Sequence, residues 1–120
     1  MPGKSIFYQV FVRDNATCVY CSKNMMSSFD SFAQIQLDHL KPKKHGGQDG
    51  VDNMVVSCSV CNNLKGSFDP TPEEELNSSN REEYIIKAKQ FISEKRCGNR
   101  SNGLFSDYNY WLKEFNSPKS

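Results

Sequence analysis

Four cysteines form two C-x-x-C pairs, Cys18/Cys21 and Cys58/Cys61, on either side of residues 22–57. A C-x-x-C pair places two thiolates on one tight turn, and two such pairs supply the four soft ligands of a tetrahedral zinc site. A closed site of this kind has no position for water or substrate, so the zinc is expected to be structural. Any chemistry must then come from harder groups held by the zinc, which are Asp38, His39 and Asn62.

Disulfide bonds are the alternative interpretation of the cysteines. They would suit a secreted chain, but the sequence begins with no positively charged segment followed by an apolar run, so we expect no signal peptide and reduced thiols. Cys97 is a fifth cysteine without a second member of a pair, and it precedes Gly98. We interpret it as a half-buried thiol and assign it no role.

Length and charge restrict the class of protein. The 120 residues are expected to form one domain, small enough to gain from a metal cross-link, so zinc is expected to be needed for folding. The net charge of +1 lacks the strong basicity typical of many nucleic-acid-binding proteins, although a mild positive excess lies in residues 1–66. No apolar stretch is long enough to cross a bilayer, so we expect a soluble, intracellular protein that does not bind membranes.

The elements that must position these groups can be predicted from the pattern of residues. Residues 5–13 favour a helix because apolar pairs recur at helical spacing, although their β-branched and aromatic residues would also suit a strand. Residues 35–40 alternate apolar and polar side chains, and residues 53–57 resume a β-rich run after a basic loop. Residues 62–66 resemble a short helix ended by Gly66. The sequence therefore predicts an α+β protein containing a strand–strand–helix unit.

The C-terminal third is predicted to be helical. Residues 71–74 have the features of a helix start, and residues 77–80 interrupt that helix. A second helix follows, with Lys95 and Arg96 in its last turn and with one apolar face formed by Tyr84, Ile85, Ala88, Phe91 and Ile92. A third apolar stripe is formed by Leu104, Phe105, Tyr108, Trp111, Leu112 and Phe115. We expect this stripe to pack on the half of the chain that contains the cysteine pairs. The alternative is that its aromatic side chains form a platform for stacking nucleic-acid bases.

The residues in and around the cysteine pairs closely resemble the HNH endonucleases, also called ββα-metal or His-Me finger nucleases. The resemblance covers about residues 10–67 and rests on Cys18-x-x-Cys21, Leu37-Asp38-His39, Gly46-Gly47, Asn53, Cys58-x-x-Cys61-Asn62 and Lys65-Gly66. It implies a ββα-metal core within a single domain of residues 1–120, flanked by an N-terminal helix and a C-terminal helical extension over about 71–116. Asn62 replaces the final histidine of the HNH name, which makes this chain an HNN variant.

The resemblance implies a metal-dependent DNA endonuclease that leaves 5′-phosphate and 3′-hydroxyl ends. His39 would be the general base, because a neutral imidazole can accept a proton from water near neutral pH. Asp38 and Asn62 would hold one Mg²⁺ or Mn²⁺, since carboxylate and amide oxygens are hard ligands. Asn53 would steady the loop that carries the base. The expected partner is double-stranded DNA, bound by a monomer or a homodimer.

Several residues have more than one interpretation. His45 could be a competing base or a phosphate contact. Lys41, Lys43, Lys44 and Lys65 could contact the DNA backbone or be solvated surface charges. The whole chain could also be a zinc-stabilised nucleic-acid-binding module without catalysis. The adjacent Asp38 and His39 favour the nuclease, because a binding module needs neither a carboxylate nor an imidazole there.

Overall fold

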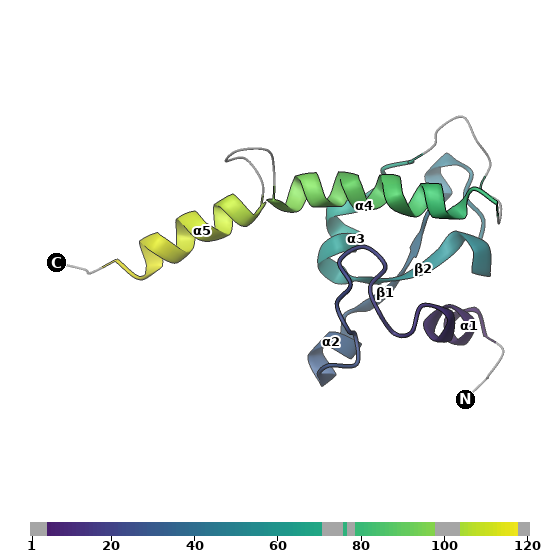
Figure 1. The fold of residues 1–120 in the computed structure, drawn as a ribbon, viewed down its shortest axis with the longest axis horizontal. Helices are drawn as coiled ribbons and strands as arrows, with labels where there is room; N and C mark the ends of the chain where they lie inside the picture. Colours follow the sequence, from purple (N-terminus) through teal and green to yellow (C-terminus); the bar gives the residue numbers. More distant parts are fainter. Residues whose placement is uncertain (1–4, 71–75, 77–78, 98–103, 118–120) are drawn as a thin grey trace.

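The computed structural model describes residues 5–70, 76, 79–97 and 104–117. The helices and strands follow one another as α1 (Ile6–Arg13), α2 (Phe29–Ala33), β1 (Ile35–His39), β2 (Met54–Cys58), α3 (Ser59–Lys65), α4 (Arg81–Cys97) and α5 (Leu104–Phe115). Two 3₁₀ turns, Lys43–His45 and Val51–Asn53, lie in the connection between the strands. Figure 1 shows the hairpin with α3 and α4 beside it, and α5 extending past the end of α4.

The two strands form an antiparallel hairpin, as predicted. Ile35 is opposite Cys58 at one end, and His39 is opposite Met54 at the other. Successive side chains of a strand point to opposite faces of the sheet. Asp38 of β1 faces α3, where it pairs with Lys65, and His39 therefore faces the other way. The carboxylate and the imidazole next to it therefore leave β1 in different directions.

The short helix α3 follows β2 directly and confirms the predicted strand–strand–helix unit. It begins at Ser59 rather than Asn62, and the Cys58 side chain caps it by accepting a hydrogen bond from the Cys61 backbone N at 3.4 Å. The helix ends before Gly66, whose φ of 56° lies in the left-handed region that favours glycine. The second cysteine pair, Cys58 at the end of β2 and Cys61 in α3, is therefore placed by the junction of strand and helix.

The N-terminal segment forms a helix, the prediction favoured over a strand. Ser5 caps α1 by accepting a hydrogen bond from the Tyr8 backbone N at 3.1 Å. Helix α2 was not predicted; Ser28 caps it through a 3.0 Å hydrogen bond from the Ser31 backbone N.

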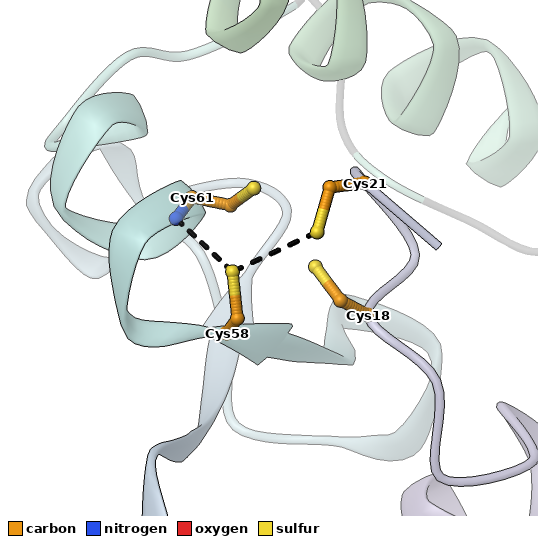
Figure 2. A group of neighbouring side chains, drawn as sticks. All are labelled: Cys18, Cys21, Cys58 and Cys61. Carbon is orange, nitrogen blue, oxygen red and sulfur yellow. Dashed lines mark hydrogen bonds between the residues drawn. The ribbon is translucent and has the colours of Figure 1, made fainter. Parts of the chain in front are cut away.

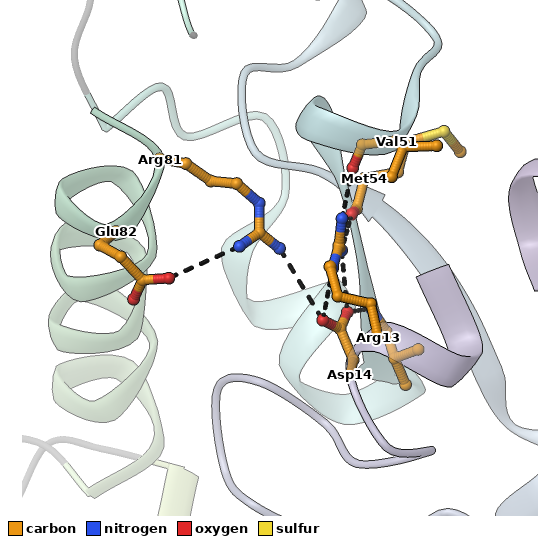
Figure 3. A network of polar contacts seen from close by, with 7 residues as sticks. Arg13, Asp14, Val51, Met54, Arg81 and Glu82 are labelled. Carbon is orange, nitrogen blue, oxygen red and sulfur yellow. Dashed lines mark hydrogen bonds and ion pairs between the residues drawn. The ribbon is translucent and has the colours of Figure 1, made fainter. Parts of the chain in front are cut away.

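The end of α1 is bound to the hairpin and to α4 by a polar network (Figure 3). Arg13 donates hydrogen bonds to the backbone oxygens of Val51 and Met54 at 2.6 and 2.5 Å. Asp14 lies 2.9 Å from Arg13 Nε and 3.8 Å from Arg81 Nη2 at the start of α4. Asp14 also accepts a 2.9 Å hydrogen bond from the Val56 backbone N, so this side chain at the end of α1 contacts both β2 and α4.

The core lies between the hairpin, the first cysteine turn and α4. The predicted apolar face of α4 is confirmed, since Tyr84, Ala88 and Ile92 are buried. They join Val10, Tyr20, Met25, Leu40, Val55, Val56 and three of the cysteines in one cluster. The helix start predicted at residues 71–74, the first half of the interruption at residues 77–80 and the thiol of Cys97 lie outside what the structure describes.

The prediction for the last apolar stripe is wrong. Its residues do form a helix, α5, and α5 contacts α4. However, its six apolar side chains are all exposed, Trp111 by 65% and Phe115 by 84%. The stripe does not pack on the zinc half in this structure, because helical spacing predicts an apolar face but does not specify the surface that covers it. None of the helices in the described part of the chain has the length and apolarity of a membrane span.

Candidate active site and zinc centre

The four paired cysteines converge at one point (Figure 2). Their sulfur atoms all lie within 4.8 Å of one another. The sulfurs of Cys21 and Cys58 are 3.8 Å apart, and tetrahedral zinc with Zn–S bonds of about 2.3 Å requires sulfurs about 3.8 Å apart. The cluster therefore fits a Cys₄ zinc site. Free thiols at all four positions argue against the disulfide alternative.

The electrostatics of the cluster also suit a cation. Hydrogen bonds from the thiols of Cys58 and Cys61 hold the pKa of Cys18 well below its usual range. Hydrogen bonding to Cys18 and Cys58 raises the pKa of Cys61. One thiolate thus suppresses the ionisation of its neighbours, and a divalent ion among the sulfurs would remove that conflict. Arg96 of α4 adds a positive charge by donating a hydrogen bond to Cys61 Sγ at 3.4 Å.

Asp38 is buried under α3 and held by two donors. Its side chain is 7% exposed. The hydroxyl of Tyr20 donates a 2.5 Å hydrogen bond to its Oδ2, and Lys65 Nζ lies 3.2 Å from the same oxygen. Burial raises the pKa of Asp38 above its ordinary value, although Lys65 and Tyr20 favour the charged form. Among the described residues, no hydrogen bond reaches the other carboxylate oxygen, Oδ1.

His39 lies at the end of β1 and is partly exposed. Its Nε2 is 2.8 Å from Asp49 Oδ1. Lys43 Nζ is 3.2 Å from Asp49 Oδ2, so one carboxylate joins the imidazole to the basic loop. The hydrogen bond from His39, with that from Lys43, lowers the pKa of Asp49 below its ordinary value. Asp49 therefore remains ionised at neutral pH and can orient the imidazole.

Asn62 lies on the exposed side of α3, close to the same face of β1 as Asp38. Its Nδ2 donates a short hydrogen bond to Gln36 Oε1. This contact leaves the amide oxygen of Asn62 as its remaining donor atom for a cation. Asp38, His39 and Asn62 all line one open hollow of about 280 Å³. The structure thus brings together the three residues predicted to carry the chemistry.

Asn53 holds the loop between the strands. Its side-chain oxygen accepts from the Lys41 backbone N at 2.8 Å, and its Nδ2 donates to the Lys41 and Gln48 backbone oxygens at 3.0 and 2.8 Å. Gly47 packs so closely here that a Cβ would lie 1.7 Å from the Lys41 oxygen. These hydrogen bonds hold the Asn53 side chain against the loop, and Asn53 is not among the residues that line the hollow.

The family model described as HNH endonuclease matches residues 18–68, the segment that contains the cysteine cluster, the hairpin, α3 and the hollow. Residues 18–68 belong to the HNH endonuclease family. The chain matches no curated protein and no solved structure. The family assignment therefore rests on this segment and on the ββα arrangement found in it.

Four lysines were predicted either to contact the DNA backbone or to be solvated surface charges, and for two of them the structure shows neither position. Lys65 is buried against Asp38 and also donates to the His39 backbone oxygen at 2.9 Å. Lys41 is buried and pairs with Asp69 Oδ2 at 2.7 Å. Neither ammonium group is at the surface, because each neutralises a carboxylate inside the domain. Lys43, Lys44 and His45 are exposed and stay candidates for a phosphate contact.

Two residues of the HNH site were not predicted from the sequence. Tyr20 lies between the first two cysteines, where the C-x-x-C spacing drew attention only to the thiols. Asp49 lies in the loop after Gly46 and Gly47, where an acidic residue is usually solvated. In the sequence, neither residue indicates a role in the site. Only the fold brings Tyr20 to Asp38 and brings Asp49, which is 10 residues after His39, to the imidazole.

Proposed function

We propose that the HNH domain is a metal-dependent endonuclease that hydrolyses phosphodiester bonds of double-stranded DNA and leaves 5′-phosphate and 3′-hydroxyl ends. The observation that carries this proposal is the common hollow lined by Asp38, His39 and Asn62. Phosphodiester hydrolysis requires an activated water and stabilisation of charge on the phosphate and the departing oxygen. These three side chains offer a proton acceptor and two hard oxygen ligands within one concavity.

Asp38 and Asn62 are the proposed ligands of the catalytic ion. Each is anchored through one atom, Asp38 by Oδ2 and Asn62 by Nδ2, so that each keeps its Oδ1 for a cation. Carboxylate and amide oxygens suit Mg²⁺ or Mn²⁺. A divalent ion bound there supplies charge stabilisation to the phosphate oxygens and to the leaving 3′ oxygen. With only two protein ligands, the rest of the coordination shell is left for water and substrate phosphate.

His39 is the proposed general base. Asp49 occupies its Nε2, which leaves Nδ1 to take a proton from water. The ionised Asp49 stabilises the imidazolium formed when Nδ1 accepts that proton. His45 is the other histidine, and it lies in an exposed turn outside the residues that line the hollow. This difference in position supports His39 as the base.

DNA is proposed to lie over the hollow and the neighbouring basic loop. Lys43 lines the hollow, and Lys44 and His45 are exposed in the same turn. Such side chains bind phosphates without reading sequence. Because the net charge is only +1 and few cationic side chains would contact phosphates, we expect weak binding with a shallow dependence on salt.

The zinc proposed for the four cysteines has a structural role. It joins the turn at Cys18 and Cys21 to the junction of β2 and α3, and all four ligand positions are taken by sulfur. The zinc would therefore hold the scaffold, and the hydrolytic chemistry would belong to the oxygen ligands and His39.

The proposal is tested with supercoiled plasmid and the purified, zinc-loaded chain. Nicked and linear products should form when Mg²⁺ or Mn²⁺ is added and should be absent when the zinc-loaded chain is assayed without an added divalent ion. End-labelling should find 5′-phosphates. Binding of DNA without cleavage under all of these conditions would favour a non-catalytic nucleic-acid-binding module. Short double-stranded RNA serves as the comparison substrate.

A further inference from the structure

Tyr20 connects the first zinc turn to the proposed catalytic carboxylate. It lies between Cys18 and Cys21, and its side chain is 4% exposed within the core. The backbone next to it is fixed by a 3.0 Å hydrogen bond from Val19 N to the Val56 oxygen of β2. Its hydroxyl donates to Asp38 Oδ2 at 2.5 Å. The phenol is thus held at one end by the core and at the other by the carboxylate.

The contact with Tyr20 determines which carboxylate oxygen can serve a cation. Tyr20 and Lys65 both bind Oδ2 of Asp38, from the zinc turn and from α3 respectively. A carboxylate fixed through one oxygen cannot rotate freely, so its second oxygen is presented in one direction. Asp38 is among the residues that line the hollow with Asn62. An ion entering the hollow would therefore meet a ligand whose orientation is already set.

We propose that Tyr20 is a positioning residue for the catalytic ion, fixing Asp38 Oδ2 so that Oδ1 is directed at the hollow. This inference rests on the proposed role of Asp38 as a metal ligand. It adds that the turn between Cys18 and Cys21 influences the affinity of the catalytic ion site at Asp38 and Asn62, through the hydroxyl group of Tyr20. Loss of the hydroxyl would leave Asp38 held by Lys65 alone and free to turn toward that ammonium group.

The test is removal of the hydroxyl alone by Tyr20→Phe, with Tyr84→Phe as the matched control. Tyr84 is also a buried core tyrosine, but it lies on α4, whereas the partners of the Asp38 carboxylate are Tyr20 and Lys65. Mn²⁺ binding to the zinc-loaded proteins is measured by electron paramagnetic resonance in the absence of DNA. Second-sphere substitutions typically weaken metal binding about 10- to 100-fold, and we expect Tyr20→Phe to fall in that range and Tyr84→Phe to bind as the parent does.

Cleavage gives a second measurement. Tyr20→Phe should need more Mg²⁺ for its half-maximal rate and should regain a rate close to that of the parent at saturating Mg²⁺, because the hydroxyl acts only through the ligand. Zinc content and the unfolding midpoint are measured on the same samples. Loss of zinc or of the folded core in Tyr20→Phe would assign the hydroxyl a structural role and overturn the inference.

The inference and the proposed nuclease activity fail in different ways. If the parent does not cleave DNA but binds Mn²⁺ more tightly than Tyr20→Phe, the activity is wrong and the positioning role stands. If the parent cleaves DNA and Tyr20→Phe has the same Mn²⁺ affinity and Mg²⁺ dependence, the positioning role is wrong and the activity stands.

Discussion

The segment from Cys18 to Asp69 and the helix α5 differ in how specifically their side chains are paired. In the first, buried polar groups have specific partners, such as Lys41 with Asp69 and Lys65 with Asp38. In α5, six large apolar side chains lie exposed. Directional contacts between charged or ligating atoms specify one arrangement, whereas an apolar stripe fits many surfaces. Single substitutions among the paired groups of the first region should therefore affect the fold of the site strongly, and substitutions in α5 should affect it little.

The largest expected effect is loss of the zinc ligands. Cys58→Ala, or prolonged chelation, should unfold the hairpin and α3, because structural zinc contributes about 10–16 kcal/mol of binding energy to folding in zinc-finger peptides. Thermal unfolding followed by circular dichroism, with zinc content measured in parallel, tests this. A metal-free protein that keeps its cooperative transition would mean that the zinc does not support the first region.

The next effect concerns the proposed base. His39→Ala should reduce the cleavage rate about 10²- to 10⁴-fold, the usual contribution of general base catalysis. Plasmid cleavage is compared with DNA binding and the unfolding midpoint, both of which should change little, because His39 is the last residue of β1 and its side chain is partly exposed. His45→Ala is the comparison and should lose much less of the cleavage rate, because His45 is proposed to contribute only a phosphate contact. The opposite result for the two variants would assign the base to His45.

The buried ion pair between Lys41 and Asp69 should matter for stability rather than for chemistry. Lys41→Met removes one partner and leaves the Asp69 carboxylate buried, which typically costs about 3–5 kcal/mol. Lys43→Met is the matched control, because the Lys43 side chain is 62% exposed. Chemical denaturation curves of the two variants test this difference. Equal stability of both variants would contradict the buried pair.

Asn62 should determine the preference for the catalytic ion. Asn62→Ala should weaken Mg²⁺ binding and lose most turnover, since one of two proposed protein ligands is removed. Asn62→His should keep some activity and shift it toward Mn²⁺, Co²⁺ or Ni²⁺, because imidazole suits borderline ions. Cleavage rates across a metal series decide this. Parent-like cleavage by Asn62→Ala at low Mg²⁺ would remove Asn62 from the ligand set.

The smallest effect is expected in α5. Trp111→Ala should change the free energy of unfolding by less than about 0.5 kcal/mol, as is usual for exposed positions, because the indole is 65% exposed. Tyr84→Ala on α4 is the comparison and should be strongly destabilising, since its ring is buried. Denaturation midpoints at several protein concentrations test this. A large loss for Trp111→Ala would show that α5 is covered in solution.

The sequence predicted the parts of the molecule that local chemistry determines. The cysteine spacing identified the four side chains that converge in one cluster, alternation identified the hairpin, and the residues after the last cysteine identified α3 with its glycine end. The buried state of Lys41 and Lys65 could not be predicted, because their partners lie 28 and 27 positions away in the chain. The contacts of Tyr20 and Asp49 could not be predicted for the same reason, because only the folded hairpin brings these side chains to Asp38 and His39.

The pairing of β1 with β2 gives Asp38 a second consequence, in the fidelity of folding. A shift of one residue along β1 would turn each of its side chains to the opposite face. Asp38 would leave the interior, and Tyr20 and Lys65 would remain there without their acceptor. An unsatisfied buried group costs about 1–3 kcal/mol, and more when it is charged. The carboxylate proposed for catalysis therefore also favours the correct register of the hairpin. In a misaligned hairpin, the Tyr20 hydroxyl and the Lys65 ammonium group would lose the hydrogen bonds that hold Asp38 in the site.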